Sequence, residues 1–149
     1  MRVVPQFSVF LINKPGVLAQ VSRQIAAARV NILAMTMTDS SEHGVLRLVA
    51  EDPERLKAAL AEVNLPTTET DVLLIDLPNR PGALADVCGK LAEGHVNISY
   101  AYVTTGAANG KTKGVFKVAD SKKAMKLLSA PNAKHRDPTV NYRRPMKIR

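Results

Sequence analysis

The sequence repeats itself with an offset of 66 residues, and this repeat constrains the fold more than any other feature. The segment 13–32 reads NKPGVLAQVSRQIAAARVNI, and the segment 79–98 reads NRPGALADVCGKLAEGHVNI, with ten of twenty residues identical. In each copy an Asn-x-Pro-Gly motif is followed by a second asparagine 18 residues after the first. Because a repeat of this length suits a small folding unit, the 149-residue chain is expected to contain two similar units.

Both copies carry the same order of expected elements. Alternating apolar residues at 7–11 and 73–77 predict a strand before each Asn-x-Pro-Gly turn, and apolar residues at helical spacing follow it. Pro15 and Pro81 are expected at the first helical position, where a missing N–H is tolerated. Further strands are expected at 30–38, 45–51, 67–71, 96–105 and 114–119, and a second helix in each copy after the capping residues Asp52 and Asp120.

The element order predicts an α+β fold, a ferredoxin-like βαββαβ unit repeated twice. In each unit the helices lie on one face of an antiparallel sheet. An exposed sheet edge favours pairing, so the two sheets are expected to join into a larger sheet. The expected boundaries are 1–68 for the first domain, 69–131 for the second, and 132–149 for a basic C-terminal extension.

The paired Asn-Lys/Arg-Pro-Gly turns and the downstream Val-Asn-Ile segments resemble the ACT-domain family of regulatory modules, in particular stand-alone proteins built of two ACT units. The resemblance covers about residues 3–130. In serine-inhibited phosphoglycerate dehydrogenases, the equivalent turn and asparagine hold an amino-acid effector between two ACT units. The resemblance therefore implies a non-catalytic sensor that binds a small amino acid. The implied ligand-binding residues are Asn13, Pro15, Gly16, Val17, Leu18, Asn31, Asn79, Pro81, Gly82, Ala83, Leu84 and Asn97.

The chemistry of these positions agrees with that implication. A helix N-terminus accepts a carboxylate, and a glycine lets a ligand approach the backbone closely. An asparagine side chain offers an acceptor for an ammonium group and a donor for a carboxylate. The alternative is that Asn-x-Pro-Gly is merely a strand-to-helix turn, with Asn31 and Asn97 at the entries of strands.

Other motifs give little support for catalysis or cofactor binding. The stretch 106–112 lacks one residue of a P-loop and leads into an expected strand, so a hairpin tip is the preferred interpretation. His43, His95 and His135 lack metal-site spacing, and no repeated histidine accompanies Cys88. Without paired carboxylates or a nucleophile motif, we expect no enzyme activity, no catalytic residue, no metal and no cofactor.

Composition and charge limit the partners. Hydrophobic residues make up 46% of the chain and aromatic residues 4%, which suits an aliphatic core and offers little for base stacking. Residues 1–110 carry a net charge of −2 and residues 111–149 a net charge of +10. A lone cysteine, no convincing signal sequence and no long apolar run predict a cytoplasmic protein without a membrane partner.

A homodimer and a metabolic enzyme are the expected protein partners. Two alternatives stay open. One is a ligand-independent regulatory subunit that resembles the small subunit of acetolactate synthase. The other, less favoured, is a basic nucleic-acid-associated protein that uses the C-terminal extension, because no recognition motif accompanies its charge. The sequence does not indicate which amino acid is bound.

Overall fold

The computed structural model describes residues 1–38, 43–104 and 111–130. These residues form the element order of two βαββα copies, which confirms the predicted α+β duplication. The elements are β1 (Arg2–Ile12), α1 (Val17–Ala27), β2 (Ile32–Thr38), β3 (His43–Ala50), α2 (Pro53–Ala61), β4 (Thr67–Pro78), α3 (Ala83–Glu93), β5 (Ile98–Val103), β6 (Lys111–Val118) and α4 (Ser121–Ser129).

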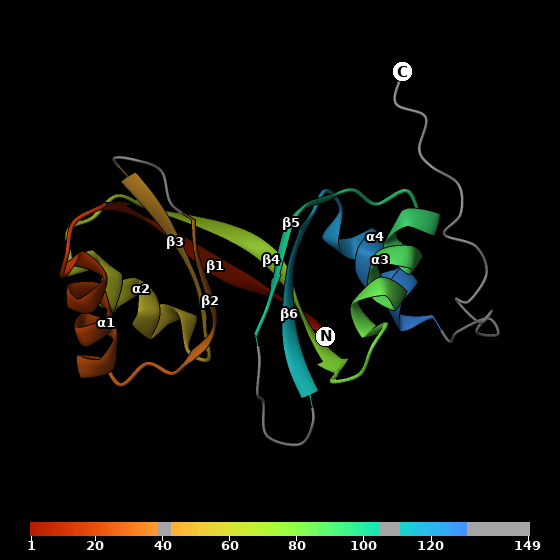
Figure 1. The fold of residues 1–149 in the computed structure, drawn as a ribbon, viewed down its shortest axis with the longest axis horizontal. Coiled ribbons are helices and arrows are strands. Elements are labelled where there is room, and N and C mark those ends of the chain that lie inside the picture. The colour runs from red at the N-terminus through yellow and green to blue at the C-terminus, as the bar shows by residue number, and fades with distance from the viewer. Residues whose placement is uncertain (39–42, 105–110, 131–149) are drawn as a thin grey trace.

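All six strands belong to one antiparallel sheet with the order β2-β3-β1-β4-β6-β5. The long strands β1 and β4 run side by side through the middle, with α1 and α2 at one end of the molecule and α3 and α4 at the other (Figure 1). The two sheets are therefore joined edge to edge, as the exposed edge of each unit predicted.

Each copy has its own aliphatic core beneath its helices. In copy one, Phe7, Val9 and Leu11 of β1 pack with residues of α1 and α2 such as Val21 and Leu56. The equivalent core of copy two contains Leu73, Ile75, Leu77, Leu91, Phe116 and Ala124. The alternation of apolar residues along β1 and β4 thus places the same side of both strands under helices.

The two central strands each serve both copies. In the register of β1 and β4, Pro5 lies opposite Asp71, its own equivalent in the 66-residue repeat, so the pairing is symmetric about this point. Residues 67–71 close the sheet of copy one, and residues 2–4 take the corresponding place beside β4 in copy two. The expected boundary between residues 68 and 69 falls within β4.

The helix-free face of the sheet curls so that the copies also meet there. The buried Gln6 donates from Nε2 to Tyr100 Oη at 2.8 Å, and Tyr102 Oη donates to Gln6 Oε1 at 3.0 Å. The guanidinium of Arg47 lies 4.4 Å from the centre of the Tyr100 ring. Buried apolar residues from both copies complete this contact: Ala34, Val49, Val72, Leu74 and Val115.

Element ends differ modestly from the expected ones. The strands expected from Val30 and Val96 begin two residues later, because the chain leaves each preceding helix through a residue with positive φ, Arg29 at 54° and His95 at 53°. The hairpin strands β3 and β6 begin earlier than expected.

Candidate functional site

The Lys14-Pro15-Gly16-Val17 segment forms a tight turn at the end of β1. The Val17 N–H lies 3.4 Å from the Lys14 carbonyl oxygen, and Gly16 has φ 90° and ψ −17°. These angles are those of the third position of a type II turn, which requires a positive φ. The second copy repeats this geometry, with φ 83° and ψ −13° at Gly82.

The prediction that Pro15 and Pro81 occupy the first helical position is wrong. The helices begin at Val17 and Ala83, and each proline lies two residues earlier, at the second position of the turn. The physical reason is the following glycine, whose left-handed conformation cannot belong to a right-handed helix. Proline still fits, because the second position of a type II turn has the φ that its ring imposes.

The helices differ in how their N-termini are capped. Asp52 and Asp120 accept hydrogen bonds from backbone N–H groups of α2 and α4, at 3.1 and 2.9 Å, as their positions in the sequence predicted. In contrast, no described side chain caps α1 or α3, whose N-caps are Gly16 and Gly82. The first-turn N–H groups of these two helices are therefore suited to an anion from outside the chain.

The turn of copy two opens onto a groove of about 320 Å³ between the start of α3 and the ends of β5 and β6. The residues that line it are Leu77, Pro78, Asn79, Arg80, Ala83, Leu84, Val103, Thr104 and Thr112. Three of the candidates, Asn79, Ala83 and Leu84, are thus brought together there. The other six lining residues were not among the predicted ligand-binding residues: Leu77, Pro78, Arg80, Val103, Thr104 and Thr112. For Arg80, the only sequence signal was its position in the repeated Asn-x-Pro-Gly turn.

Arg80 is the charged group of this groove. Its Nη2 lies 2.6 Å from Asp86 Oδ2, and its Nη1 donates to the Pro81 carbonyl at 3.1 Å. Copy one has Lys14 and Gln20 at the equivalent positions, so it lacks this ion pair. A planar guanidinium held in this way presents its remaining N–H groups in a fixed direction, which suits a carboxylate.

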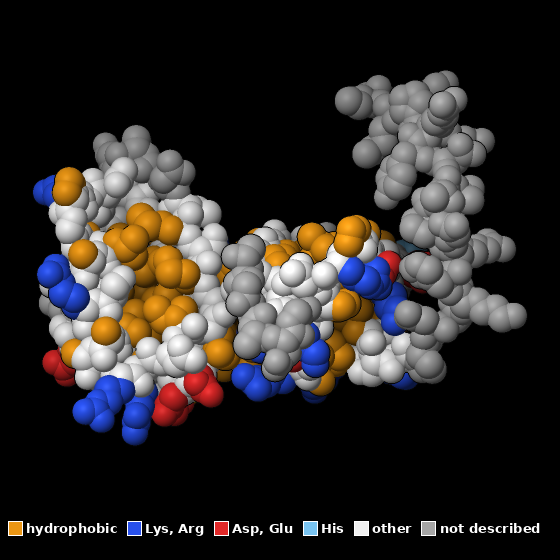
Figure 2. Space-filling view, turned by 60° about the horizontal axis from the view of Figure 1, so that its bottom comes forward, with side chains coloured by type: hydrophobic (Ala, Val, Ile, Leu, Met, Phe, Trp, Pro, Cys, Tyr) orange, Lys and Arg blue, Asp and Glu red, His pale blue; other side chains and the backbone are white. Residues whose placement is uncertain are grey.

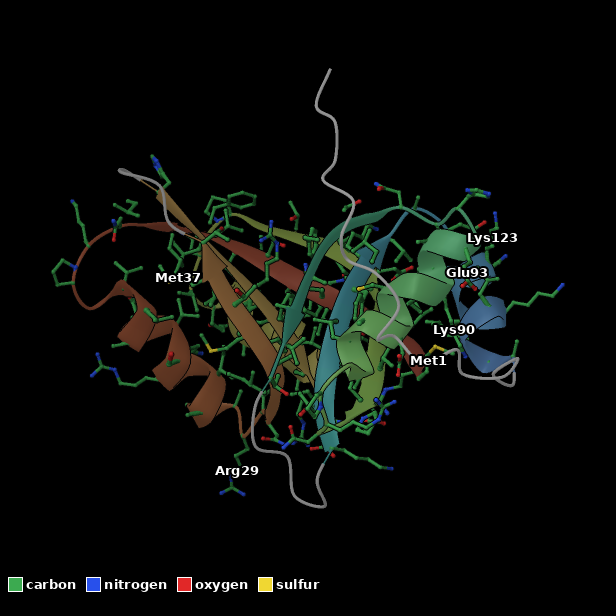
Figure 3. The ribbon with its side chains drawn as sticks, turned by 45° about the vertical axis from the view of Figure 1, so that its right-hand side comes forward. Met1, Arg29, Met37, Lys90, Glu93 and Lys123 are labelled. Carbon is green, nitrogen blue, oxygen red and sulfur yellow. The ribbon has the colours of Figure 1, made fainter. Side chains whose placement is uncertain are left out.

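A second groove, of about 290 Å³, lies on the other side of Arg80 between α3 and β4. Figure 3 shows Met1 and Lys90, which both line it, on the copy-two half. Asp76 lines it as well and accepts a hydrogen bond from Lys113 Nζ at 2.8 Å. That hydrogen bond, together with the nearby N-terminus and Lys111, lowers the pKa of Asp76.

The downstream asparagines do not meet the turns within one chain. Asn31 and Asn97 precede β2 and β5, and each lies beyond the far end of the helix that starts at the turn of its own copy. By the strand register, Asn31 lies at the level of Val4, about 30 Å along the strand direction from Asn13. Asn31 Nδ2 donates to Glu51 Oε2 at 3.2 Å, whereas copy two has Ala119 at the position of Glu51.

The remaining sequence motifs, which are the glycine-containing stretch 106–112, the histidines and Cys88, lie only partly within the described residues. Lys111 and Thr112 begin β6, and residues 106–110 and His135 lie outside the described residues. Cys88 is partly buried against the core of copy two. In the described part of the chain, no group of three His, Cys, Asp or Glu residues could hold a metal ion. Nor does any helix in that part have the length and apolar character needed to span a membrane.

Comparisons with known proteins agree with this architecture. Protein BT0572 from Bacteroides thetaiotaomicron is 33% identical, with a TM-score of 0.77 over 85% of this chain and 86% of that chain. The ligand-free regulatory subunit of aspartate kinase from Thermus thermophilus is 13% identical, with a TM-score of 0.58 over 86% of this chain and 95% of that chain. A structure of aspartokinase α and β subunits is 19% identical, with a TM-score of 0.56 and the same two coverages. The latter two likenesses show a shared fold.

No curated protein matches the sequence. A family model described as an ACT domain pair matches residues 1–135. The resemblance seen in the repeated turns is thereby confirmed, and the chain belongs to the ACT domain pair family.

Proposed function

We propose that this ACT domain pair is a non-catalytic sensor that binds a free α-amino acid and regulates a metabolic enzyme. The observation that carries the proposal is the contrast among the helix N-termini. The helices that follow the Asn-x-Pro-Gly turns are the ones without a side-chain cap in the described structure. The similar protein from Thermus thermophilus is a regulatory subunit of aspartate kinase, which supports a regulatory role.

The groove of copy two offers complementary groups for both charges of an amino acid. The carboxylate would accept hydrogen bonds from the first turn of α3 and from Arg80, where the helix dipole also favours negative charge. The amide oxygen of Asn79 would accept from the ammonium group. The remaining candidates at the turn, Pro81 and Gly82, would shape the approach to the helix.

A homodimer is the second part of this proposal. Asn31 and Asn97 precede β2 and β5, which are each paired on one side only among the described strands. If these asparagines contact ligand, a second chain must bring them to a turn. Apolar side chains also gather on the surface of the copy-one half (Figure 2), where the exposed residues include Leu18 and Met35. Light scattering on the purified chain would test the dimer.

The binding test is a thermal-shift screen against the proteinogenic L-amino acids, followed by calorimetry. A ligand at a hundredfold its Kd would stabilise the protein by about 2.7 kcal/mol, enough for a clear rise in Tm. The D-enantiomer of each chiral hit is the control, because a site that fixes the carboxylate, the ammonium group and the side chain together should reject it. If none of the L-amino acids raises Tm or gives a heat of binding, the sensor proposal is wrong and a ligand-independent regulatory subunit becomes the better explanation.

A further inference from the structure

The two outer strands of the sheet carry nothing that protects them from pairing. Among the described strands, β2 and β5 are each paired on one side only (Figure 1). Natural sheets protect such edges with charged residues or proline, and neither strand contains one. Large apolar side chains on these strands and on the neighbouring helices are 37–46% exposed: Leu18, Met35, Met37, Leu84 and Val103. Both edges are therefore suited to pairing with another chain.

The two edges differ in side-chain size on the helix-covered face of the sheet. Met35 and Met37 lie on this face of β2, because each is opposite a buried core leucine of β3. The equivalent residues of β5 are Ala101 and Val103. On this face, long side chains thus stand at the edge of copy one and short side chains at the edge of copy two.

On the helix-free face the difference in size is reversed. Tyr100 and Tyr102 of β5 lie on this face, where both contact Gln6. The equivalent residues of β2 are Ala34 and Thr36. Here the large side chains belong to the edge of copy two and the small ones to the edge of copy one.

This double difference favours the pairing of unlike edges. If β2 paired with β2 of a second chain, methionines would meet on one face and only small side chains on the other. Pairing of β5 with β5 would bring tyrosines together and leave a gap beside alanine and valine. Pairing of β2 with β5 sets long side chains beside short ones on both faces, which is the arrangement that fills an interface to the density of a protein interior.

The strand register gives the alignment of such a pair. Thr36 lies at the level of Ser8, and Asn13 is five residues beyond Ser8. Asn97 is five residues before Tyr102, and the bulge at the start of β5 shortens that span by about one residue. If Thr36 faces Tyr102 of the partner subunit in an antiparallel pair, Asn97 of the partner subunit comes within about one residue of the level of Asn13. The repeat makes the same true of the other asparagine and the other turn.

Building on the homodimer proposed above, we propose that two chains pair through their unlike edges. The β2 strand of each chain lies antiparallel to β5 of the other, with Thr36 facing Tyr102 of the partner subunit. Met35 then faces Val103 of the partner subunit, and Met37, labelled in Figure 3, faces Ala101 of the partner subunit. Because this contact occurs twice around one two-fold axis, all four edges are covered and the assembly closes at two chains.

Disulfide cross-linking tests which edges meet. In a Cys88→Ser background, which introduces the residue of the equivalent position Ser22, the variant Met37→Cys/Ala101→Cys should form a covalent dimer on mild oxidation. Facing residues of antiparallel strands have Cβ atoms about 4.5–5.5 Å apart, close to the separation that a disulfide needs. Neither single variant should cross-link, and non-reducing electrophoresis measures the yield.

Two further variants serve as controls for the cross-linking. Met35→Cys/Met37→Cys places both thiols on β2, so a covalent dimer of this variant would show β2 paired with β2 and overturn the proposal. Ala58→Cys/Lys126→Cys places thiols at exposed positions of α2 and α4 and measures cross-linking by random collision. A yield for Met37→Cys/Ala101→Cys no higher than for this control would also overturn the proposal.

Exchanging the side-chain sizes tests the fit independently. Ala101→Met/Val103→Met puts long side chains at both edges and should weaken dimerisation at least about tenfold in sedimentation experiments. Adding Met35→Val/Met37→Ala exchanges the sizes between the edges and should return the dimer dissociation constant close to the wild-type value. If the four-residue variant dimerises no better than the two-residue variant, the proposed match of long with short side chains is wrong.

These measurements need no ligand, so they are independent of the test of the sensor function. A wild-type chain that is monomeric, or that forms assemblies larger than a dimer in light scattering, would overturn the closed pairing even if an amino acid binds. If the cross-linked dimer forms as expected but none of the L-amino acids binds, the sensor proposal fails while the pairing of unlike edges stands.

Discussion

Gly16 shows that a backbone conformation alone can require glycine. Its φ is 90°, yet a Cβ atom added there would meet nothing within 4 Å. We predict that Gly16→Val destabilises the protein by about 1–3 kcal/mol, because a β-branched residue is strained at this φ. Gly16→Asn should cost less, since asparagine tolerates the left-handed region. Urea denaturation measures both.

Gly89 is the control for this prediction. It lies inside α3, is exposed, has no positive φ, and an added Cβ would likewise meet nothing. Gly89→Ala should therefore stabilise the protein by about 0.5–1 kcal/mol. A Gly16→Val variant as stable as the wild type would contradict the backbone strain.

The equivalent substitution in copy two, Gly82→Val, should weaken ligand binding more than it destabilises the fold. The added side chain would lie near the path by which a ligand approaches the N-terminus of α3.

Gln6 of β1 is linked to β5 on the helix-free face through the hydroxyl groups of Tyr100 and Tyr102. Gln6→Leu would leave those hydroxyl groups without this partner, and we predict a loss of about 1–3 kcal/mol in the free energy of unfolding. Tyr102→Phe in the Gln6→Leu background should then cost much less than in the wild type. Additive losses in this double-mutant cycle would show that the two side chains do not interact.

Burial raises the pKa of Tyr102. In the unfolded chain this phenol ionises near its ordinary pKa of about 10, whereas the folded protein keeps its proton to higher pH. The unfolded state therefore binds fewer protons above this pH, and stability must fall as pH rises. We predict a smaller fall for Tyr102→Phe than for the wild type in unfolding curves between about pH 9 and 11. Equal slopes for the two proteins would contradict the buried, protonated phenol.

At the scale of elements, the helices fall into a capped pair and an uncapped pair. Asp52→Ala and Asp120→Ala each remove a hydrogen bond to a first-turn N–H, and each should cost about 1 kcal/mol of stability. Asp→Asn at the same positions keeps an acceptor and should cost less. Chemical denaturation measures the difference, and an alanine variant with an unchanged midpoint would show that the cap contributes nothing.

At the scale of the whole molecule, copy two depends on the first residues of the chain. Residues 2–4 pair with Val72, Leu73 and Leu74 in the place that residues 67–71 take in copy one. Deleting residues 1–4 should therefore destabilise the protein and expose this edge of β4 to association. Removing residues 131–149, which lie outside both repeats, should leave cooperative unfolding intact. Circular dichroism melts compare the two deletions, and the opposite ranking would show that the C-terminal extension supplies the closing strand.

The sequence by itself determined the features that depend on neighbours a few residues apart. The repeat, the period-2 and helical patterns, the two glycine turns and the aspartate caps all follow from local backbone and hydrogen-bond chemistry. These patterns were sufficient for the ACT-type fold and for the turns at the candidate site. They failed at Pro15, because proline suits both a first helical turn and a type II turn, and only the φ of Gly16 separates the two.

The tertiary structure decided which distant groups meet. The pairing of residues 2–4 with β4, the contact of Gln6 with Tyr100 and Tyr102, and the methyl group of Met37 over Gly44 all join separate elements. A strand pattern shows which face is buried but not which edge is paired, and a sheet can curl in ways that no local pattern records. For the same reason, the equal spacing of Asn31 and Asn97 from their turns did not indicate that each asparagine lies beyond the far end of the helix that starts at its turn.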